Sequence, residues 1–466
     1  MSGAKRRLVA VSNRVGPLTD EGKAGGLAVG LSDALRRRGG VWFGWSGEVS
    51  AEGTDSEART ETVGNVSMVT IDLTQEEVDG FYYGYANRSL WPLLHYRLDL
   101  AQFDRASDRV YRAVNQRFAA RLMPMLRDDD IIWVHDYHFF HLGSELRQQG
   151  FKGSVGFYLH IPFCPPEMFS ALPSGVDIVK AMLAYDLVGF QTDTDRRNFI
   201  QFCVRELGGE KLKGHRVRVG GRVVSARTFP IGIDAEGFAR FAVSPEASEH
   251  EEMVRGMAGD RLQIVGVDRM DYSKGLVERL LGFERLLEDY PENRGAVQFL
   301  QVAPLSRSEL DAYAELRRDL ESLSGHVNGR FATLDWTPFQ IMTTGFTRRA
   351  LAGIYRAARV CLVTPLRDGM NLVAKEFVAA QDPQDPGVLV LSRFAGARAE
   401  LSEALIVNPY STDDVARALQ RALSMPLEER QERWRAMRAA VFGNTASYWC
   451  EAFLAELESI PKDVPA

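Results

Sequence analysis

The sequence predicts an α/β protein built on two doubly wound parallel sheets, and three features of the chain lead to this prediction. Short apolar runs recur, each followed by a polar turn and then by apolar residues at helical spacing. Uniformly apolar runs are typical of parallel strands that helices cover on both faces. This series occurs twice, and the Pro and Gly residues of segment 228–238 separate the two occurrences. Repeated strand, turn and helix units form a doubly wound sheet.

The length and charge of the chain limit the classes of protein to which it can belong. A chain of 466 residues is too long for one core of ordinary size, so we expect two domains. Its composition, 45% apolar and 25% charged, is that of a soluble globular protein. The net charge of −6 argues against a nucleic-acid-binding surface, so an anionic substrate would need a local basic pocket.

The cysteines and the first residues indicate the cellular compartment. Four cysteines lie far apart without a C-x-x-C pair, which favours reduced thiols over disulfides or a zinc site. The first apolar run ends at Ser12, which is too short for a signal peptide, and no run reaches the length of a membrane span. We therefore expect a cytoplasmic protein that binds no membrane.

The first predicted strand, residues 7–12, leads into two candidate phosphate contacts. Arg14 follows the strand directly and could grip a phosphate, although a solvated loop charge has the same sequence. Gly25 and Gly26 precede a helix over residues 27–38, so the backbone there could approach an anion. An ordinary flexible turn is the alternative for this glycine pair.

Aromatic and polar residues follow in the first half of the chain. Segment 81–91 is unusually aromatic; most of it should pack in a core, and Tyr82 and Trp91 are candidates for a pocket wall. Asp136 lies at the end of the predicted strand 131–134 and could accept a hydrogen bond from a hydroxyl group. The H-D-Y-H cluster there is a weak metal candidate, because adjacent residues of an extended chain point to opposite faces.

The second series of strands carries the cationic residues. Strand 262–267 leads into D-R-M-D-Y-S-K-G, where Arg269 and Lys274 lie beside the start of a helix and form a candidate diphosphate cradle. Arg307 follows the next strand of this series, at residues 299–302. These residues supply the local basic pocket that the overall charge does not.

The stretch V-T-P-L-R-D-G-M-N-L-V-A-K-E, residues 363–376, is the most informative part of the chain. An apolar strand at 360–363 precedes it, and a helix follows the break at Gly369. The start of that helix suits a phosphate, and Asp368, Asn371 and Glu376 could accept hydrogen bonds from sugar hydroxyls. A capped turn without function would have similar residues.

Taken together, these stretches resemble the trehalose-6-phosphate synthases, which form glycosyltransferase family 20. The matching motifs run in family order from residue 9 to about residue 410: V-S-N-R, A-G-G-L-A-V-G, W-F-G-W-S-G, L-W-P-L-L-H-Y-R, W-V-H-D-Y-H, H-I-P-F, P-I-G-I, D-R-M-D-Y-S-K-G-L, A-P-L-S-R, T-P-L-R-D-G-M-N-L-V-A-K-E and S-R-F-A-G-A. Where the family often has a second proline after H-I-P-F, this chain has Cys164.

The resemblance implies the GT-B fold, in which two Rossmann-like domains face a cleft and a final helix crosses back. The corresponding ranges are 1–235 for the acceptor domain, 236–445 for the nucleotide-sugar domain, and 446–466 for the helix that packs on the first domain. The implied reaction is a retaining transfer of glucose from a nucleotide donor, expected to be UDP-glucose, to glucose 6-phosphate. No cofactor or metal is implied, a homodimer or homotetramer is expected, and we expect no appended phosphatase domain.

The resemblance also implies roles for individual residues. Arg269 and Lys274 would bind the donor diphosphate, Glu376 the ribose, and His160 and Asp368 the transferred glucose. The implied catalytic residues are Arg269, Lys274, His160 and Asp368. The implied donor-binding residues are Gly25, Gly26, Arg269, Lys274, Phe346, Asp368, Gly369, Met370, Asn371, Leu372, Val373, Ala374, Lys375 and Glu376. The implied acceptor-binding residues are Arg14, Tyr82, Trp91, Asp136 and Arg307, with Arg14 and Arg307 on the sugar phosphate.

The implied chemistry agrees with the residue types. Departure of a diphosphate develops negative charge, which fixed cations stabilise, and we find no paired carboxylates of the kind that a retaining glycosidase uses. In the family, the leaving phosphate itself is thought to take the acceptor proton. Two alternatives remain: a related synthase with another acceptor, such as glycerol 3-phosphate, and a non-catalytic sensor of sugar phosphates.

Overall fold

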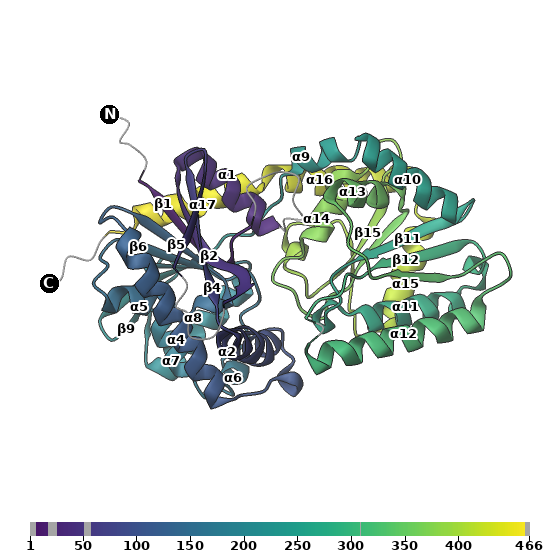
Figure 1. The fold of residues 1–466 in the computed structure, drawn as a ribbon. Helices are drawn as coiled ribbons and strands as arrows, with labels where there is room; N and C mark the ends of the chain where they lie inside the picture. Colours follow the sequence, from purple (N-terminus) through teal and green to yellow (C-terminus); the bar gives the residue numbers. More distant parts are fainter. Residues whose placement is uncertain (1–5, 17–25, 51–56, 308, 462–466) are drawn as a thin grey trace. The chain divides into compact units, whose positions relative to one another are not determined.

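A computed structural model describes residues 6–16, 26–50, 57–307 and 309–461 (Figure 1). The chain divides into two compact units: residues 1–231 together with 446–466 form unit 1, and residues 232–445 form unit 2. Each unit is built around one sheet, and both sheets are mainly parallel. The predicted α/β class with two parallel sheets is therefore confirmed.

Unit 1 contains a sheet whose strands lie in the order β3-β4-β2-β1-β5-β6-β7-β10-β9-β8. The stretch from β4 to β10 is parallel, whereas β3, β8 and β9 pair antiparallel at the edges. The strands are β1 (Leu8–Arg14), β2 (Gly40–Val49), β3 (Arg59–Val63), β4 (Val66–Leu73), β5 (Ile131–His135), β6 (Ser154–Tyr158), β7 (Leu187–Phe190), β8 (Glu210–Leu212), β9 (Arg216–Val219) and β10 (Arg222–Thr228).

The helices of unit 1 connect these strands. They are α1 (Gly26–Arg38), α2 (Gln75–Glu77), α3 (Trp91–Leu94), α4 (Arg105–Leu122), α5 (Leu142–Gln148), α6 (Pro166–Phe169), α7 (Gly175–Met182), α8 (Asp193–Leu207) and α17 (Ala446–Ser459). The aromatic segment forms a π-helix, η1 (Val78–Leu90), in which Phe81 and Tyr85 are buried. Most of this segment packs in the core, as its composition predicts.

Unit 2 contains a wholly parallel sheet with the strand order β13-β12-β11-β14-β15-β16. Its strands are β11 (Leu262–Val267), β12 (Val297–Val302), β13 (Phe339–Met342), β14 (Val360–Val363), β15 (Val388–Ser392) and β16 (Leu405–Val407). Its helices are α9 (Ala235–Phe241), α10 (Pro245–Ala258), α11 (Leu276–Asp289), α12 (Asp311–Phe331), α13 (Arg348–Ala357), α14 (Leu372–Ala380), α15 (Thr412–Ser424) and α16 (Leu427–Gly443).

Each sheet has a point at which the chain reverses its direction across the strands. In unit 1 the chain runs from β1 outward to β2 and β4, then returns to place β5 on the other side of β1. In unit 2 it runs from β11 to β12 and β13, then returns to place β14 on the other side of β11. Ligands of open α/β sheets bind at the carboxyl ends of the strands that flank such a point. The loops after β1, β5, β11 and β14 are therefore the expected ligand-binding loops of the two sheets.

The last helix, α17, packs on β6 and β7 of unit 1, and in Figure 1 it lies in yellow beside the purple and blue first part of the chain. The ring of Phe453 stacks on Trp133 with the centroids 4.6 Å apart. Two strand glycines permit this approach: a Cβ atom at either Gly156 or Gly189 would lie 2.8 Å from the Phe453 ring. Among the described residues, no helix has both the length and the apolar character needed to cross a membrane.

Candidate active site

The loop after β11 places Lys274 against the loop after β14. The Lys274 ammonium lies 2.5 Å from Oδ2 of Asp368, and both side chains are largely buried. Gly275 makes the approach possible, because its φ is +63° and a Cβ atom there would lie 2.2 Å from the carbonyl oxygen of Thr364. The structure therefore brings together the predicted diphosphate cation and a predicted sugar contact at the reversal point of unit 2.

Asn371 fixes the start of α14. Its side-chain oxygen accepts a hydrogen bond from the backbone N–H of Ala374 at 3.3 Å, which caps the helix. Its amide nitrogen donates to Oδ2 of Asp368 at 3.1 Å. Asn371 adopts a φ of +77°, a conformation that side chains other than glycine rarely take. The first backbone N–H groups of α14 carry a partial positive charge. The side chain of Asn371 thus links this helix start to the Lys274–Asp368 pair.

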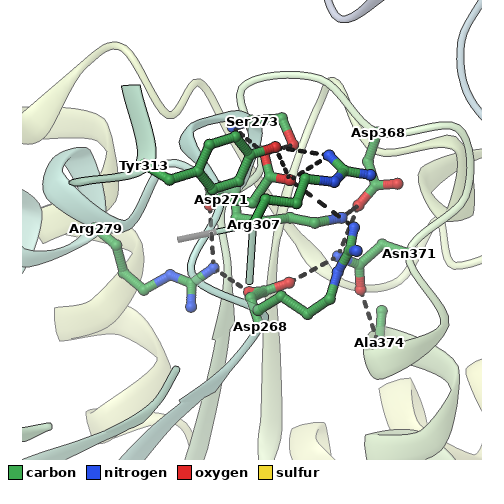
Figure 2. A network of polar contacts seen from close by, with 11 residues as sticks. Asp268, Asp271, Ser273, Arg279, Arg307, Tyr313, Asp368, Asn371 and Ala374 are labelled. Atoms are coloured by element: carbon green, nitrogen blue, oxygen red, sulfur yellow. Dashed lines mark hydrogen bonds and ion pairs between the residues drawn. The ribbon is translucent and has the colours of Figure 1, made fainter. Parts of the chain in front are cut away.

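A buried ion pair lies beneath these residues. Arg279 of α11 has no exposed surface, and its Nη2 donates to Oδ2 of Asp268 at 2.6 Å. Its other nitrogens donate to Thr364 at 2.9 Å and to Gln301 at 3.0 Å. Figure 2 shows Asp268 between Arg279 and Asn371. Burial raises the pKa of Asp268, although Arg279 and Lys274 oppose the shift. This network joins β11, β12 and β14 under the site.

Arg269 and Arg307 lie above a second buried carboxylate, that of Asp271. Arg269 is half-exposed and its Nη2 is 3.8 Å from Asp271 Oδ2, so its guanidinium can reach a ligand. Arg307, after β12, is 3.5 Å from the same oxygen and has a φ of +50°. Figure 2 shows Asp271 in contact with Ser273 and Tyr313 as well.

The remaining donor-site residues of unit 2 lie on α14 and before α13. Burial raises the pKa of Glu376 to about 7, while Arg348 and Tyr355 oppose the shift. Phe346 is partly exposed, and its ring is 6.0 Å from that of His250. The Lys375 side chain is buried, and its ammonium pairs with Glu400 at 2.6 Å in the interior of unit 2. Only the backbone of Lys375 is therefore left for a ligand.

The other residues of the predicted donor stretch differ in exposure. Leu372 and Val373, at the start of α14, are partly exposed, whereas Gly369, Met370 and Ala374 are buried. Gly369 packs so closely against Gly396 that a Cβ atom at Gly396 would lie 1.9 Å from the carbonyl oxygen of Gly369. Of these five residues, Leu372 and Val373 are therefore the ones whose side chains a ligand can contact.

In unit 1, three predicted residues follow adjacent strands. Arg14 ends β1, Asp136 follows β5 and His160 follows β6, and these strands are neighbours in the sheet. The backbone N–H of His160 donates to Oδ1 of Asp136 at 3.2 Å. Burial lowers the pKa of His160 to about 3, so this ring is neutral at physiological pH, and its Nε2 lies 3.1 Å from Nδ1 of His135.

Aromatic rings border Arg14. Its guanidinium carbon is 4.5 Å from the centre of the Trp45 ring and 5.8 Å from that of Tyr82, within cation–π range. Tyr82 in turn stacks on His138 with the centroids 6.0 Å apart. Trp91 is largely buried and packs on His95, with a centroid distance of 4.1 Å.

Gly25 lies outside the described residues, and Gly26 is the first residue of α1. In the described part of the chain, no group of three or more His, Cys, Asp or Glu side chains is arranged to hold a metal ion.

Comparison with known proteins identifies the family. Residues 9–459 match the model of glycosyltransferase family 20. The chain belongs to glycosyltransferase family 20. The trehalose-6-phosphate synthase of Sinorhizobium fredii is 48% identical over 455 residues, which span 97% of this chain and 98% of the relative. As a member of family 20, the chain is a glycosyltransferase.

Solved structures of family 20 agree over nearly the whole chain. The α,α-trehalose-phosphate synthase (UDP-forming) of Burkholderia xenovorans in complex with glucose-6-phosphate is 47% identical with a TM-score of 0.93, covering 97% of this chain and 100% of that one. The E. coli trehalose-6-phosphate structure bound with UDP-2-fluoro glucose is 44% identical with a TM-score of 0.94, covering 98% and 99%. These matches confirm the resemblance and the GT-B fold.

Four residues of the polar network at the candidate site were missed by reasoning from sequence, namely Asp268, Asp271, Arg279 and Tyr313. Arg279 carried a usable signal, because it lies in the apolar stripe of α11 with Leu276 and Phe283. A charge in such a stripe requires a buried partner. Gly266 of β11 was a second signal: a Cβ atom there would lie 2.7 Å from Arg279 Nη1, so the glycine makes room for the guanidinium.

Proposed function

We propose that this chain transfers glucose from UDP-glucose to glucose 6-phosphate and forms α,α-trehalose 6-phosphate and UDP. Trehalose-6-phosphate synthases that share nearly its full length support the proposal, as do solved relatives with glucose-6-phosphate and with UDP-2-fluoro glucose. The observation that carries it furthest is the Lys274–Asp368 contact at the reversal point of unit 2, beside Arg269 and the start of α14.

The donor diphosphate would occupy the space beside Lys274, Arg269 and the first N–H groups of α14. As the bond from the anomeric carbon to the phosphate oxygen breaks, negative charge grows on that oxygen, and fixed cations stabilise it without reorganisation. Once Lys274 turns to the phosphate, the carboxylate of Asp368 can accept a hydrogen bond from a glucose hydroxyl. The chain's own cations thus supply the charge stabilisation, and no metal is part of the proposal.

The other residues have narrower roles in this proposal. Glu376 would accept the ribose hydroxyls, and Phe346 would lie near the base. His160 is neutral and would hydrogen-bond the transferred glucose. Arg14 and Arg307 would bind the phosphate of glucose 6-phosphate. Further donor contacts are proposed for Gly25, Gly26 and the backbone of residues 369–375, and further acceptor contacts for Tyr82, Trp91 and Asp136.

Retention of configuration in this proposal requires no protein nucleophile. The acceptor hydroxyl would attack from the face that the phosphate leaves, and the departing phosphate oxygen would take its proton. The new bond joins the anomeric carbon of the donor glucose to the anomeric oxygen of the acceptor. Both anomeric carbons then share one oxygen, so the product is a non-reducing disaccharide phosphate. We further propose that the protein acts in the cytoplasm as a homodimer or homotetramer.

Nucleotide release by the purified protein tests the function. We expect release of UDP from UDP-glucose that depends on glucose 6-phosphate, and weaker or no release from ADP-glucose and GDP-glucose. Release that depends on glycerol 3-phosphate instead would show a synthase with another acceptor. Binding of UDP-glucose and glucose 6-phosphate without any turnover would show a non-catalytic sensor. Each of these two results would contradict the proposal.

A further inference from the structure

Asp271 is a carboxylate with no exposed surface that is surrounded by donors. Its Oδ1 accepts hydrogen bonds from the backbone N–H of Ser273 at 3.0 Å and from the Ser273 hydroxyl at 2.8 Å. Its Oδ2 accepts one from the Tyr313 hydroxyl at 3.0 Å and faces the guanidinium group of Arg307 (Figure 2). The guanidinium of Arg269 is 3.8 Å from the same oxygen. Oδ1 thus fixes the backbone and side chain of Ser273 in the loop after β11, and Oδ2 faces the two arginines.

Tyr313 is the direct neighbour of Arg307. Arg307 Nη1 donates to the Tyr313 hydroxyl at 2.6 Å, and that hydroxyl donates onward to Asp271. Tyr313 is buried in the first turn of α12, and burial together with Asp271 raises its pKa far above the ordinary value, so the hydroxyl stays neutral. A neutral hydroxyl can accept from the arginine and donate to the carboxylate at the same time.

The Arg307 side chain is therefore held by two neighbours, Tyr313 and Asp271. Its side chain is 7% exposed, its φ is +50°, and its guanidinium is 3.5 Å from the Asp271 carboxylate. A buried arginine in an uncommon backbone conformation needs such partners to keep one orientation. Fixing that orientation in advance lowers the entropy lost when a phosphate binds.

We propose that Tyr313 and Asp271 are positioning residues that hold Arg307 ready for the phosphate of the acceptor, and that Asp271 also orients Arg269 for the donor diphosphate. The inference rests on the proposed function, which assigns Arg307 to the acceptor and Arg269 to the donor. The Tyr313 hydroxyl accepts a hydrogen bond from Arg307, whereas Asp271 forms ion pairs with both arginines.

This difference in contacts predicts different effects for two substitutions. Tyr313→Phe removes one oxygen atom and keeps the ring, which packs against Tyr272 with the centroids 5.2 Å apart. We expect it to weaken glucose 6-phosphate binding about tenfold and to leave UDP binding within about twofold of wild type. Asp271→Asn keeps an acceptor for Ser273 but removes the charge, and we expect it to weaken binding of both ligands.

A double-mutant cycle measured by titration calorimetry tests whether Tyr313 acts through Arg307. The four proteins are wild type, Tyr313→Phe, Arg307→Lys and the double variant, and the ligands are glucose 6-phosphate and UDP. Since Arg307→Lys removes the guanidinium that Tyr313 holds, adding Tyr313→Phe to it should change the glucose 6-phosphate Kd by less than about twofold. Tyr290→Phe, at the end of α11, is the matched control and should bind both ligands as wild type does.

Three results would overturn the inference: an unchanged glucose 6-phosphate Kd in Tyr313→Phe, equal losses for glucose 6-phosphate and UDP in that variant, or fully additive losses in the cycle. The Tyr313→Phe data decide the matter even if Asp271→Asn fails to fold. Failure of the underlying function gives a different result, because the wild-type protein would then release no UDP with glucose 6-phosphate. That outcome would remove the proposed function and this inference together.

Discussion

At the scale of single residues, the candidate site of unit 2 contains charges that are paired with one another. Lys274 pairs with Asp368, and Arg279 pairs with Asp268 directly below. A ligand phosphate must therefore compete with a carboxylate for Lys274, and it releases that carboxylate for another hydrogen bond. Binding of the diphosphate to Lys274 would thereby free Asp368, the carboxylate that we assign to the transferred glucose.

Replacing Lys274 should slow the chemical step. Because the ammonium stabilises charge that develops on the leaving phosphate, we expect Lys274→Met to lower kcat/KM for UDP-glucose by about 10²- to 10³-fold. Steady-state assays of UDP release measure this. Lys211→Met, at an exposed lysine of the edge strand β8, is the control and should keep wild-type activity. A Lys274→Met enzyme within tenfold of wild type would contradict the assigned role.

Glu376 predicts a dependence of donor binding on pH. Burial raises its pKa to about 7, so the carboxylate predominates only above that pH. If ribose binds the carboxylate, the Kd for UDP-glucose should rise about tenfold between pH 8 and pH 6. Calorimetry at several pH values measures the slope, and Glu376→Gln should remove it. An equal slope in Glu376→Gln would show that another group titrates.

The same shift has a consequence for stability. An acid whose pKa is higher in the folded than in the unfolded state destabilises the folded protein as it ionises. The contribution of Glu376 to the free energy of unfolding therefore falls as the pH rises from 4.5, the ordinary pKa of the group, to about 7. In Glu376→Gln that loss is absent. The free energy of unfolding should therefore decline less over this pH window in the variant than in wild type.

At the scale of elements, the start of α14 depends on both the side chain and the backbone conformation of Asn371, the residue that precedes the helix. Asn371 caps the helix and adopts a φ of +77°. Asn371→Ala loses the cap and strains the backbone, so we expect the free energy of unfolding to fall by about 2 kcal/mol. Asn371→Gly loses the cap but relieves the backbone, so its loss should be smaller. Urea denaturation that ranks the two variants in the opposite order would exclude this explanation.

The elements also show what the sequence can and cannot predict. The strands at 131–134, 262–267 and 360–363 were predictable because an uninterrupted apolar run is a local signal. The loops after them were predictable as candidate ligand sites because polar or charged residues follow each run. The π-helix at Val78–Leu90 was not predicted, because its wider hydrogen-bonding pattern leaves no familiar apolar period.

The buried polar network beneath the site was unpredictable for a different reason. Arg279, Asp268, Thr364 and Gln301 come from four separate segments, and only the folded sheet brings them together. A sequence shows that a charge lies in an apolar stripe but not which carboxylate receives it. Partners that are distant in sequence are determined by the order of the strands in the sheet, which local sequence patterns do not reveal.

At the scale of the whole molecule, the chain leaves unit 1 near Ile231 and returns to it at Ala446. These two crossings lie side by side at the border of unit 2, where a Cβ atom at Gly232 would lie 1.9 Å from the backbone oxygen of Asn444. The returning helix α17 then completes the core of unit 1. Residues at the two ends of the sequence therefore stabilise the same unit.

This arrangement predicts that the stability of unit 1 depends on the strand glycines under α17. Gly156→Ala would place a Cβ atom 2.8 Å from Phe453 and Leu457, so we expect a loss of about 1–3 kcal/mol. Differential scanning calorimetry measures the change. Gly325→Ala on α12, where a Cβ atom meets nothing within 4 Å, is the control and should be neutral or stabilising. Equal effects of the two substitutions would contradict the packing argument.

The central claim is that the chain joins two glucose units through their anomeric carbons. The most direct measurement is the identity of the product formed from UDP-glucose and glucose 6-phosphate, by mass spectrometry together with a reducing-sugar assay. The account predicts a disaccharide monophosphate that has no reducing end and whose formation matches the UDP released. A reducing disaccharide phosphate, or free glucose released by hydrolysis of the donor, would contradict it.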